Sequence, residues 1–413
     1  MMGIMRLSLV LLLGVVALSA AKDYHGYGLY RVHNSSEVYK ITSSLPGIDW
    51  WSHHPSLKNG KGDLMVAPIV RKTFEGLLKS RRLRFEVLSD NVQSLVNAEK
   101  QRQRAAEERG RADGRISFDR YYRHAEINQY LEEVAAAHPD IATLIDAGQS
   151  YEGRDMKAIK LSSGSGKRMK PNCPAGIHAR EWISPAVAVY LLQQLTEGSA
   201  TDLVNDVDWI ILPVLNPDGY EFTFEDDRFW RKTRSITPGE SCMGVDANRN
   251  FDFHWMESGA SSWACDETFA GNKAFSEPEA RNLKKIILDH ASQIDAYITL
   301  HSYGQYILYP WGYSSDLPDD WRDLDKLGNE INDAIAAVRG TTYDVGSSGA
   351  DLYPAAGASD DWSKGVAGIK YSYTIELPGG GMGGFDLPPE EIQGVVEETL
   401  EGLKVVGKRI GGN

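Results

Sequence analysis

Short apolar runs alternate with amphipathic segments along most of this chain. From residue 116 onward, runs typical of buried strands fall at 141–146, 209–215, 296–300 and 371–377. Between them, apolar residues recur every three or four positions, which predicts helices at 125–137, 185–195, 277–290, 321–338 and 389–410. This alternation predicts an α/β domain in which helices flank a mixed sheet.

The chain before residue 100 has a different pattern. Strand-like runs at 29–32, 64–66 and 83–88 are interleaved with helical patterns near 73–78 and 92–99, which predicts a small α+β domain. The following stretch, 99–115, is charged and has no apolar face. It is therefore expected to be the end of a helix that runs into an exposed, arginine-rich linker.

The first 21 residues have the features of a secretory signal peptide. Arg6 precedes an apolar run at 7–18, and small residues end at Ala21, the expected cleavage point. The run is short for a membrane span, and no later segment has 18 uninterrupted apolar residues. We therefore expect a secreted, extracellular protein without a membrane partner.

Composition indicates an ordinary globular protein. Of the 413 residues, 42% are hydrophobic and 24% are charged, and the length suggests two or three domain-sized units. The net charge of −13 argues against nucleic acid as a partner, because phosphate binding needs a basic surface.

Three cysteines allow one internal disulfide, which an exported protein can form. Cys242 and Cys265 lie in Gly- and Ser-rich sequence, where a crosslink would restrain a flexible excursion of the chain. We expect these two to pair and Cys173 to remain free.

A candidate metal site begins with His178-Ala-Arg-Glu181. Ser184 and the proline after it open an apolar run, so both candidates are expected in a loop at a helix N-terminus, with Ser184 as the N-cap. A second copy of the pattern, His254-Trp-Met-Glu257, has no such scaffold and is interpreted as a chance match.

A catalytic zinc usually has three protein ligands, so a third residue is needed. His301 directly follows the apolar run at 297–300. The carboxyl ends of strands in α/β sheets commonly face the active site, which makes His301 the candidate third ligand.

Seven stretches of the chain share one order and approximate spacing with a known family: 176–184, 216–219, 229–235, 244–250, 301–303, 353–362 and 369–376. On these stretches, residues 116–410 resemble the pancreatic-type metallocarboxypeptidases, and the earlier region is similar to that family's prosegment. The resemblance implies the carboxypeptidase fold, an α/β fold with a mixed eight-stranded sheet, preceded by a small ferredoxin-like α+β prosegment. It also implies a signal peptide at 1–21, an activation prosegment with its basic linker at 22–111, and a catalytic domain at 112–413.

The same resemblance implies one Zn²⁺ per chain, held by His178, Glu181 and His301. Because zinc acidifies water, Glu376 could take the proton as general base and later pass it to the leaving amine. Arg231 could stabilise the oxyanion, while its neighbours Arg228, Lys232 and Arg234 are expected to be solvated. Asp246 is either a carboxylate that orients a zinc-binding imidazole or a residue of a turn.

An exopeptidase must also recognise a free α-carboxylate. Asn248 and Arg249 offer an amide and a planar guanidinium for this purpose. By resemblance, Tyr353 covers bound substrate, and Arg180 and Tyr303 are further substrate contacts.

Asp360 falls where B-type members of the family have an aspartate at the floor of the side-chain pocket and A-type members an apolar residue. A buried carboxylate there requires a cationic partner, and the small Ser348 would leave room for a long Lys or Arg side chain. We therefore expect a zymogen of an enzyme that removes C-terminal Lys or Arg from peptides. The alternatives are Asp360 as a helix cap, an A-type enzyme for apolar C-termini, and an inert binding protein.

Two further expectations concern partners and modification. A trypsin-like protease is expected to activate a monomeric zymogen by cutting after Arg109, Arg111 or Arg115. Asn34 begins a glycosylation sequon in the prosegment.

The segment before His178 departs from the family pattern. Pro171 and Pro174 are poorly suited to the central strand expected before His178. We therefore expect the strand that supports the zinc site to be altered.

Overall fold

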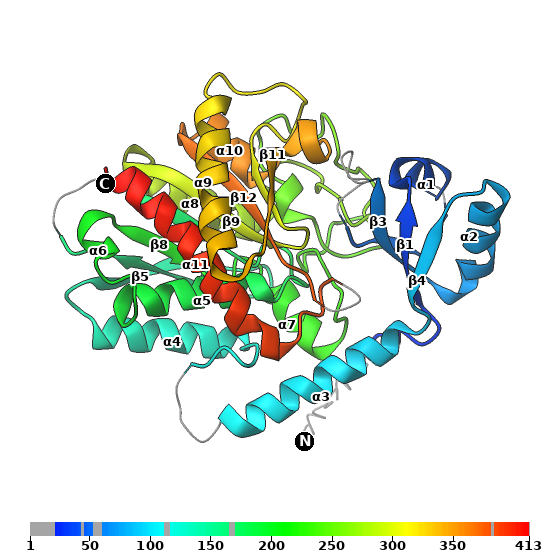
Figure 1. Cartoon of the computed structure of the whole chain (residues 1–413), viewed down its shortest axis with the longest axis horizontal. Helices are drawn as coiled ribbons and strands as arrows, with labels where there is room; N and C mark the ends of the chain where they lie inside the picture. Colours follow the sequence, from blue (N-terminus) through cyan, green and yellow to red (C-terminus); the bar gives the residue numbers. More distant parts are fainter. Residues whose placement is uncertain are drawn as a thin grey trace, which may run out of the picture.

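The computed structural model describes residues 21–42, 45–52, 60–110, 116–164, 170–380 and 384–412. Residues 1–20 of the predicted signal peptide, together with Arg111 and Arg115 of the predicted linker, lie outside these ranges. Figure 1 shows a large α/β unit, a small unit beside it, and a long helix, α3, that runs from the small unit along the large one.

The large unit is built on a mixed sheet of eight strands, in the order β11-β10-β12-β9-β7-β8-β6-β5. Its strands are β5 Ala142–Gln149, β6 Asp155–Leu161, β7 Lys170–Pro174, β8 Trp209–Leu212, β9 Ile294–Ser302, β10 Tyr306–Tyr309, β11 Asp344–Ser347 and β12 Tyr371–Leu377. Its helices are α4 His124–Ala137, α5 Ile183–Thr196, α6 Leu203–Asp206, α7 Pro217–Glu225, α8 Pro278–His290, α9 Trp321–Arg339, α10 Ser359–Gly365 and α11 Pro389–Gly411. The four strands and five helices predicted for this region are all present, with small shifts at their ends.

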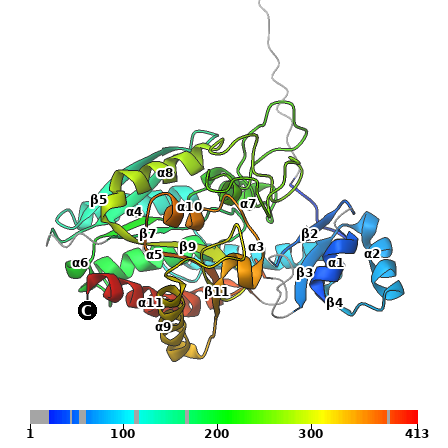
Figure 2. The same ribbon diagram turned by 90° about the horizontal axis from the view of Figure 1, so that it is seen from above.

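Two apolar clusters, one on each face, explain the pattern of the sequence. The larger cluster joins the sheet to α4, α5, α9 and α11, whose buried residues recur at helical spacing. The smaller one joins the opposite face to α8 and α10, which Figure 2 shows above the sheet. Strands β8, β9 and β12 are buried on both faces, and for this reason they read largely as apolar runs.

Strand β7 lies in the centre of the sheet, between β9 and β8, and pairs with both in parallel. The register shifts between Lys170 and Pro171, and Pro174 closes the strand. A bulge and a strand end tolerate the missing N–H of proline, and Asn172 and Cys173 between them are fully buried. The supporting strand is therefore present in the centre of the sheet, and it is irregular at Pro171, one of the two prolines on which the expectation of an altered strand rested.

The small unit has the ferredoxin-like order expected for a prosegment: β1 Gly28–His33, α1 Ser35–Thr42, β2 Ile48–Trp50, β3 Lys61–Val66, α2 Pro68–Ser80 and β4 Phe85–Ser89. Its antiparallel sheet has the order β2-β3-β1-β4. Tyr30 packs with Phe74 in its own core, whereas the neighbouring Leu29 belongs to a cluster that contains Phe229 and Phe385 of the large unit. One face of the small sheet therefore packs against the large unit.

Helix α3, Val92–Gly110, is longer than the predicted 92–99 and includes the charged stretch as far as residue 110. Glu99, Gln103 and Ala106 on one side of it are buried. Gln103 Nε2 donates to the Tyr121 carbonyl at 2.5 Å, and the Tyr121 N–H donates back to Gln103 Oε1 at 3.0 Å. A polar helix face can be buried in this way because its hydrogen bonds are satisfied. Hydrophobic periodicity cannot predict such burial, because the buried residues are polar.

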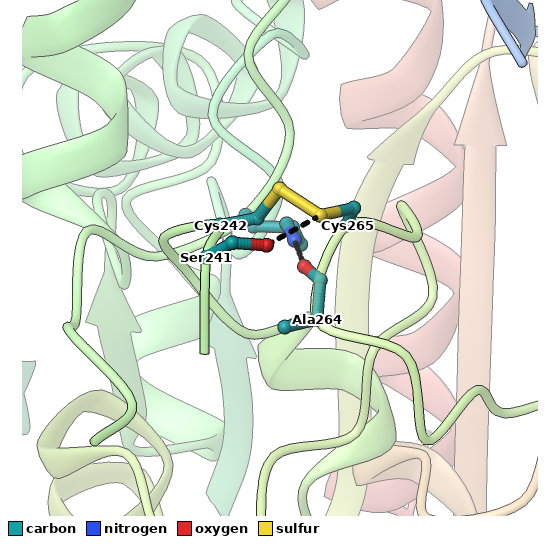
Figure 3. The surroundings of a disulfide bond; sticks show 5 residues. Ser241, Cys242, Ala264 and Cys265 are labelled. Atoms are coloured by element: carbon teal, nitrogen blue, oxygen red, sulfur yellow. Dashed lines mark hydrogen bonds between the residues drawn. A yellow bond between two sulfur atoms is a disulfide. The ribbon is translucent and has the colours of Figure 1, made fainter. Parts of the chain in front are cut away.

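The predicted disulfide is confirmed. Cys242 and Cys265 are bonded, with Cα atoms 5.0 Å apart, and Cys173 is free and buried. Figure 3 shows the bond between two loop segments, where Ser241 Oγ lies 3.5 Å from Cys265 Sγ. In the described part of the chain, no helix is both long and apolar enough to cross a membrane.

Candidate active site

Three central elements bring the candidate metal ligands together. His178 and Glu181 lie in the loop between the end of β7 and the start of α5, and His301 lies near the carboxyl end of β9. Because β7 and β9 are parallel neighbours, both ends reach the same edge of the sheet. Among the described residues, these three form the one buried His/Cys/Asp/Glu group whose ligand atoms all lie within 4.8 Å of one another.

The donor atoms of this group converge on one point. The Nδ1 atoms of His178 and His301 are 3.2 Å apart, and Glu181 oxygens lie 2.8 Å from the first and 3.2 Å from the second. Two ring nitrogens and a carboxylate at these separations are the donor set of a catalytic zinc, which leaves further coordination positions open. The group therefore fits a zinc ion.

The far side of each imidazole is held by another residue. His178 Nε2 lies 3.0 Å from Asp246 Oδ1, and His301 Nε2 lies 3.1 Å from Thr299 Oγ1. Asp246 is fully buried; burial raises the pKa of its carboxyl, but Arg231 and then His178 outweigh that effect and hold the pKa well below its usual range. An ionised carboxylate at this place orients the ring, as the first interpretation of Asp246 requires.

Arg231 reaches the same centre from the loop after α7. Its Nη2 donates to Asp246 Oδ2 at 2.9 Å, and its Nη1 lies 4.0 Å from Glu181 Oε1. Burial lowers the pKa of the guanidinium, but the negative charges of Asp246 and Glu181 outweigh this effect. The net pKa is raised, so Arg231 stays charged. A fixed positive charge thus lies beside the candidate metal site.

Glu376 lies next to this centre because of strand register. It is paired with His301 across β12 and β9 and with Tyr306 across β12 and β10, and it is 3% exposed. It lines a cavity of about 40 Å³ that also contains side chains of His178, Arg231 and His301. The structure therefore brings the predicted base and two of the three predicted ligands, His178 and His301, into one cavity.

Asp360 borders the same cavity from α10, as does Ser348 from the turn before Tyr353. The Asp360 carboxyl is buried and accepts a hydrogen bond from Thr374 Oγ1 at 3.0 Å. Burial raises its pKa, and the Thr374 hydrogen bond opposes that effect. Sequence reasoning missed Thr374, although its position two residues before Glu376 places it on the same face of β12.

The helix-cap interpretation of Asp360 is not supported. The N-cap position of α10 is Ala358, whose side chain makes no capping bond. The neighbouring Asp361 instead accepts the backbone N–H groups of Gly312 and Tyr313 at 2.8 and 2.9 Å. Asp361 thus fixes the loop after β10 and leaves Asp360 facing the cavity.

The predicted carboxylate-binding residues line the same cavity as Asp360. Asn248 and Arg249 are in a short helical turn, and Asn248 Oδ1 accepts the Ser359 N–H at 2.9 Å. Arg249 is held by the Gly259 and Asn248 carbonyls at 2.9 Å, and its Nη2 is 3.4 Å from the Tyr353 hydroxyl. Both side chains and Tyr353 line the 40 Å³ cavity.

The small unit lies over the outer part of the cleft. Arg180 Nη1 donates to Asp49 of β2 at 2.9 Å, and the Tyr303 hydroxyl donates to Asp63 of β3 at 3.4 Å. A second cavity, of about 390 Å³, lies between the two units, and Arg180, Arg231 and Tyr353 face it from the large unit. Two predicted substrate contacts are thus occupied by carboxylates of the small unit.

A buried ion pair anchors α3. Arg228 Nε and Nη2 donate to the Glu99 carboxylate at 2.5 and 2.9 Å, and both side chains are almost fully buried. The guanidinium also donates to the Arg180 and Phe385 carbonyls and lies over the Trp182 ring. The prediction that Arg228 is a solvated surface charge was wrong.

Its two neighbours were also assigned incorrectly. Lys232 is buried and donates to the Ala264 carbonyl at 2.6 Å. Arg234 is partly buried and lies over the Phe222 ring at 3.6 Å. These cations contact carbonyl groups and aromatic rings from other parts of the chain. The sequence around each cation does not indicate such contacts.

Two other local interpretations can be compared with the structure. The N-cap of α5 is Trp182, whose side chain makes no capping bond, so Ser184 lies inside the helix and its assignment as N-cap was wrong. His254 and Glu257 contact each other at 2.8 Å in an exposed loop, and the His254 ring stacks on Tyr313. This second copy is not part of the metal-ligand group.

Comparison with known proteins agrees with the fold. The family model for zinc carboxypeptidases matches residues 127–402, and the model for carboxypeptidase activation peptides matches 35–99. Carboxypeptidase B of Astacus astacus is 49% identical over 294 residues, which cover 70% of this chain and 97% of that protein. Zinc carboxypeptidase A 1 of Anopheles gambiae is 37% identical over 404 residues, which cover 96% of this chain and 92% of that protein. The crystal structure of carboxypeptidase A from Helicoverpa armigera has a TM-score of 0.87 at 33% identity, and the match covers 94% of this chain and 98% of that one.

Taken with the donor group, these matches define a metal-dependent peptidase that is made with an activation segment. The chain belongs to the zinc carboxypeptidase family. It is a metallocarboxypeptidase zymogen, and the family implies zinc as its metal.

Proposed function

We propose that this chain is a secreted zymogen whose mature enzyme removes C-terminal Lys or Arg from peptides. Its signal peptide would end at residue 21, its activation prosegment at 111, and its catalytic domain would occupy 112–413. The disulfide and the signal-like N-terminus support export. The observation that carries the specificity is the buried carboxylate of Asp360 in the cavity beside Glu376 and the candidate metal ligands.

His178, Glu181 and His301 would hold the zinc. When bound, this ion supplies Lewis-acid polarisation of the scissile carbonyl and acidifies water for attack. Asp246 and Thr299 fix the rings of the two histidines so that both Nδ1 atoms point to the metal position. The ligand geometry is thus set before any substrate enters.

The residues around the metal position divide the remaining work. Glu376 would accept the proton of the attacking water and return it to the leaving nitrogen. Arg231 would stabilise negative charge on the carbonyl oxygen, and Asn248 with Arg249 would bind the α-carboxylate of the last residue. Tyr353, beside Arg249, would close over the bound C-terminus.

Asp360→Ile tests the specificity. A cationic side chain would lose its counter-charge, and an apolar one would no longer face an unpaired carboxylate, so the two substrates respond in opposite directions. We expect the ratio of kcat/KM for C-terminal Arg over Phe peptides to fall at least about a hundredfold, corresponding to roughly 3 kcal/mol.

The adjacent Asp361 offers a matched control, since its carboxylate is occupied by backbone N–H groups rather than facing the cavity. Asp361→Asn is expected to keep the Arg/Phe ratio. An Asp360→Ile enzyme that binds zinc and has a ratio within about threefold of the wild type would show that Asp360 does not select the side chain.

Proteolysis tests the zymogen. Arg109 lies exposed in the last turn of α3, and the small unit lies over the cleft, so the intact chain should be nearly inactive on small substrates. After trypsin treatment, N-terminal sequencing should find a start near Ala112 or Ile116, together with the appearance of activity. Full activity of the uncut chain would contradict the proposed role of the small unit.

A further inference from the structure

Asp227 is a buried carboxylate on the wall of the 390 Å³ cavity between the two units. It belongs to the large unit, between α7 and Arg231. The Lys22 ammonium donates to its Oδ2 at 2.9 Å, the Tyr24 hydroxyl donates to its Oδ1, and the Phe229 N–H donates to Oδ1 at 3.2 Å. An ammonium group of the chain itself is therefore seated on this carboxylate.

Both side-chain donors to Asp227 belong to the activation segment. When that segment leaves, Lys22 and Tyr24 leave with it, and the Phe229 N–H still donates to the carboxylate. Their departure uncovers Asp227 to the cleft, and an anion that has lost its cationic partner attracts another cation. The mature enzyme would thus present an anion in its substrate cleft.

The surroundings of this anion are those of a substrate subsite. The same cavity is lined by Arg180, Arg249 and Tyr353, three residues predicted from the sequence to contact substrate. Glu267 also lines it, and its Oε2 is buried without a hydrogen-bond partner among the described residues. Burial lowers the pKa of the Lys22 ammonium, but Asp227, with smaller effects of Asp49 and Glu267, outweighs burial and raises it.

We propose that Asp227, flanked by Glu267, forms an anionic subsite that binds a Lys or Arg side chain upstream of the scissile bond, and that Lys22 occupies it in the zymogen. This proposal rests on the proposed function, because it describes a second part of the same substrate. The preferred substrates are peptides with basic residues both at the C-terminus and before it.

The wild-type enzyme, activated by trypsin, provides the first test. Peptides that all end in the same preferred residue, and whose other upstream residues are uncharged, carry one lysine or one glutamine at each upstream position in turn. We expect kcat/KM to be about tenfold higher for lysine than for glutamine at one position, and nearly equal at the others. Equal values at every position overturn the proposal. Because the C-terminal residue is constant, this result is independent of the Arg/Phe preference that tests the proposed function.

Variants then locate the subsite. In Asp227→Asn the lysine/glutamine ratio at that position should fall to near one, and in Glu267→Gln it should fall partly. Asp316→Asn makes the same change in charge at an exposed residue that does not line the cavity, and it should keep the wild-type ratio. A ratio that survives in Asp227→Asn, or falls equally in Asp316→Asn, shows that Asp227 only anchors the activation segment. If Asp227→Asn lowers activity on all peptides but keeps the lysine/glutamine ratio, the proposal is overturned in the same way.

Discussion

Replacing His178 by alanine is expected to remove zinc and activity together. The donor group has two ring nitrogens and one carboxylate, all buried and within 4.8 Å of one another. A catalytic zinc held by three protein ligands has no spare ligand, so the loss of one removes most of its affinity. Glu181→Ala should have the same result.

Metal content after dialysis, measured beside turnover of a small peptide, tests this expectation. His254→Ala is a matched control, because it removes the histidine of the other His-x-x-Glu pattern from an exposed loop. That variant should keep both metal and activity. A His178→Ala protein that retains one zinc per chain would remove His178 from the ligands.

Glu376→Gln is expected to keep the metal and to lower kcat by about a thousandfold, within the range typical of general-base catalysis. The amide fills the same space in the cavity but cannot accept a proton from water at neutral pH. Since Glu376 is not one of the three converging ligands, zinc content should not change.

Glu257→Gln, in an exposed loop, makes the same chemical change outside the cavity and should leave kcat near the wild-type value. Single-turnover measurements would separate a slow chemical step from slow product release. A zinc-loaded Glu376→Gln enzyme whose kcat stays within about tenfold of the wild type would contradict the assignment of the base.

Much of the fold could be predicted because its main signals are local. The buried run at 371–377 is β12 with the same bounds, and the spacing of apolar residues at 389–410 gave α11 to within one residue. His301 could be placed because it follows an apolar strand, whose carboxyl end is where α/β sheets commonly place active-site residues.

What could not be predicted depends on contacts between distant segments. The burial of Glu99 is stabilised by Arg228, which lies 129 residues further along the chain. The sequence around either residue does not indicate this ion pair. Pro171 fits a central strand because of a register shift that only the neighbouring strand reveals. Thr374 becomes informative only when Asp360 is placed beside it.

The pairing of Glu99 with Arg228 has a consequence for how long the activation segment stays bound. While the chain is uncut, α3 faces its site at an effective concentration that is about millimolar for a short connection, so even weak contacts keep it in place. After the cut, binding depends on the actual concentration of the two pieces, and dilution favours their separation. Arg228 keeps the Arg180 and Phe385 carbonyls and the Trp182 ring as partners when Glu99 departs. When α3 leaves, Arg228 therefore loses Glu99 but still has hydrogen-bond partners in the catalytic domain. The extent of dissociation then depends on the concentration of the two pieces.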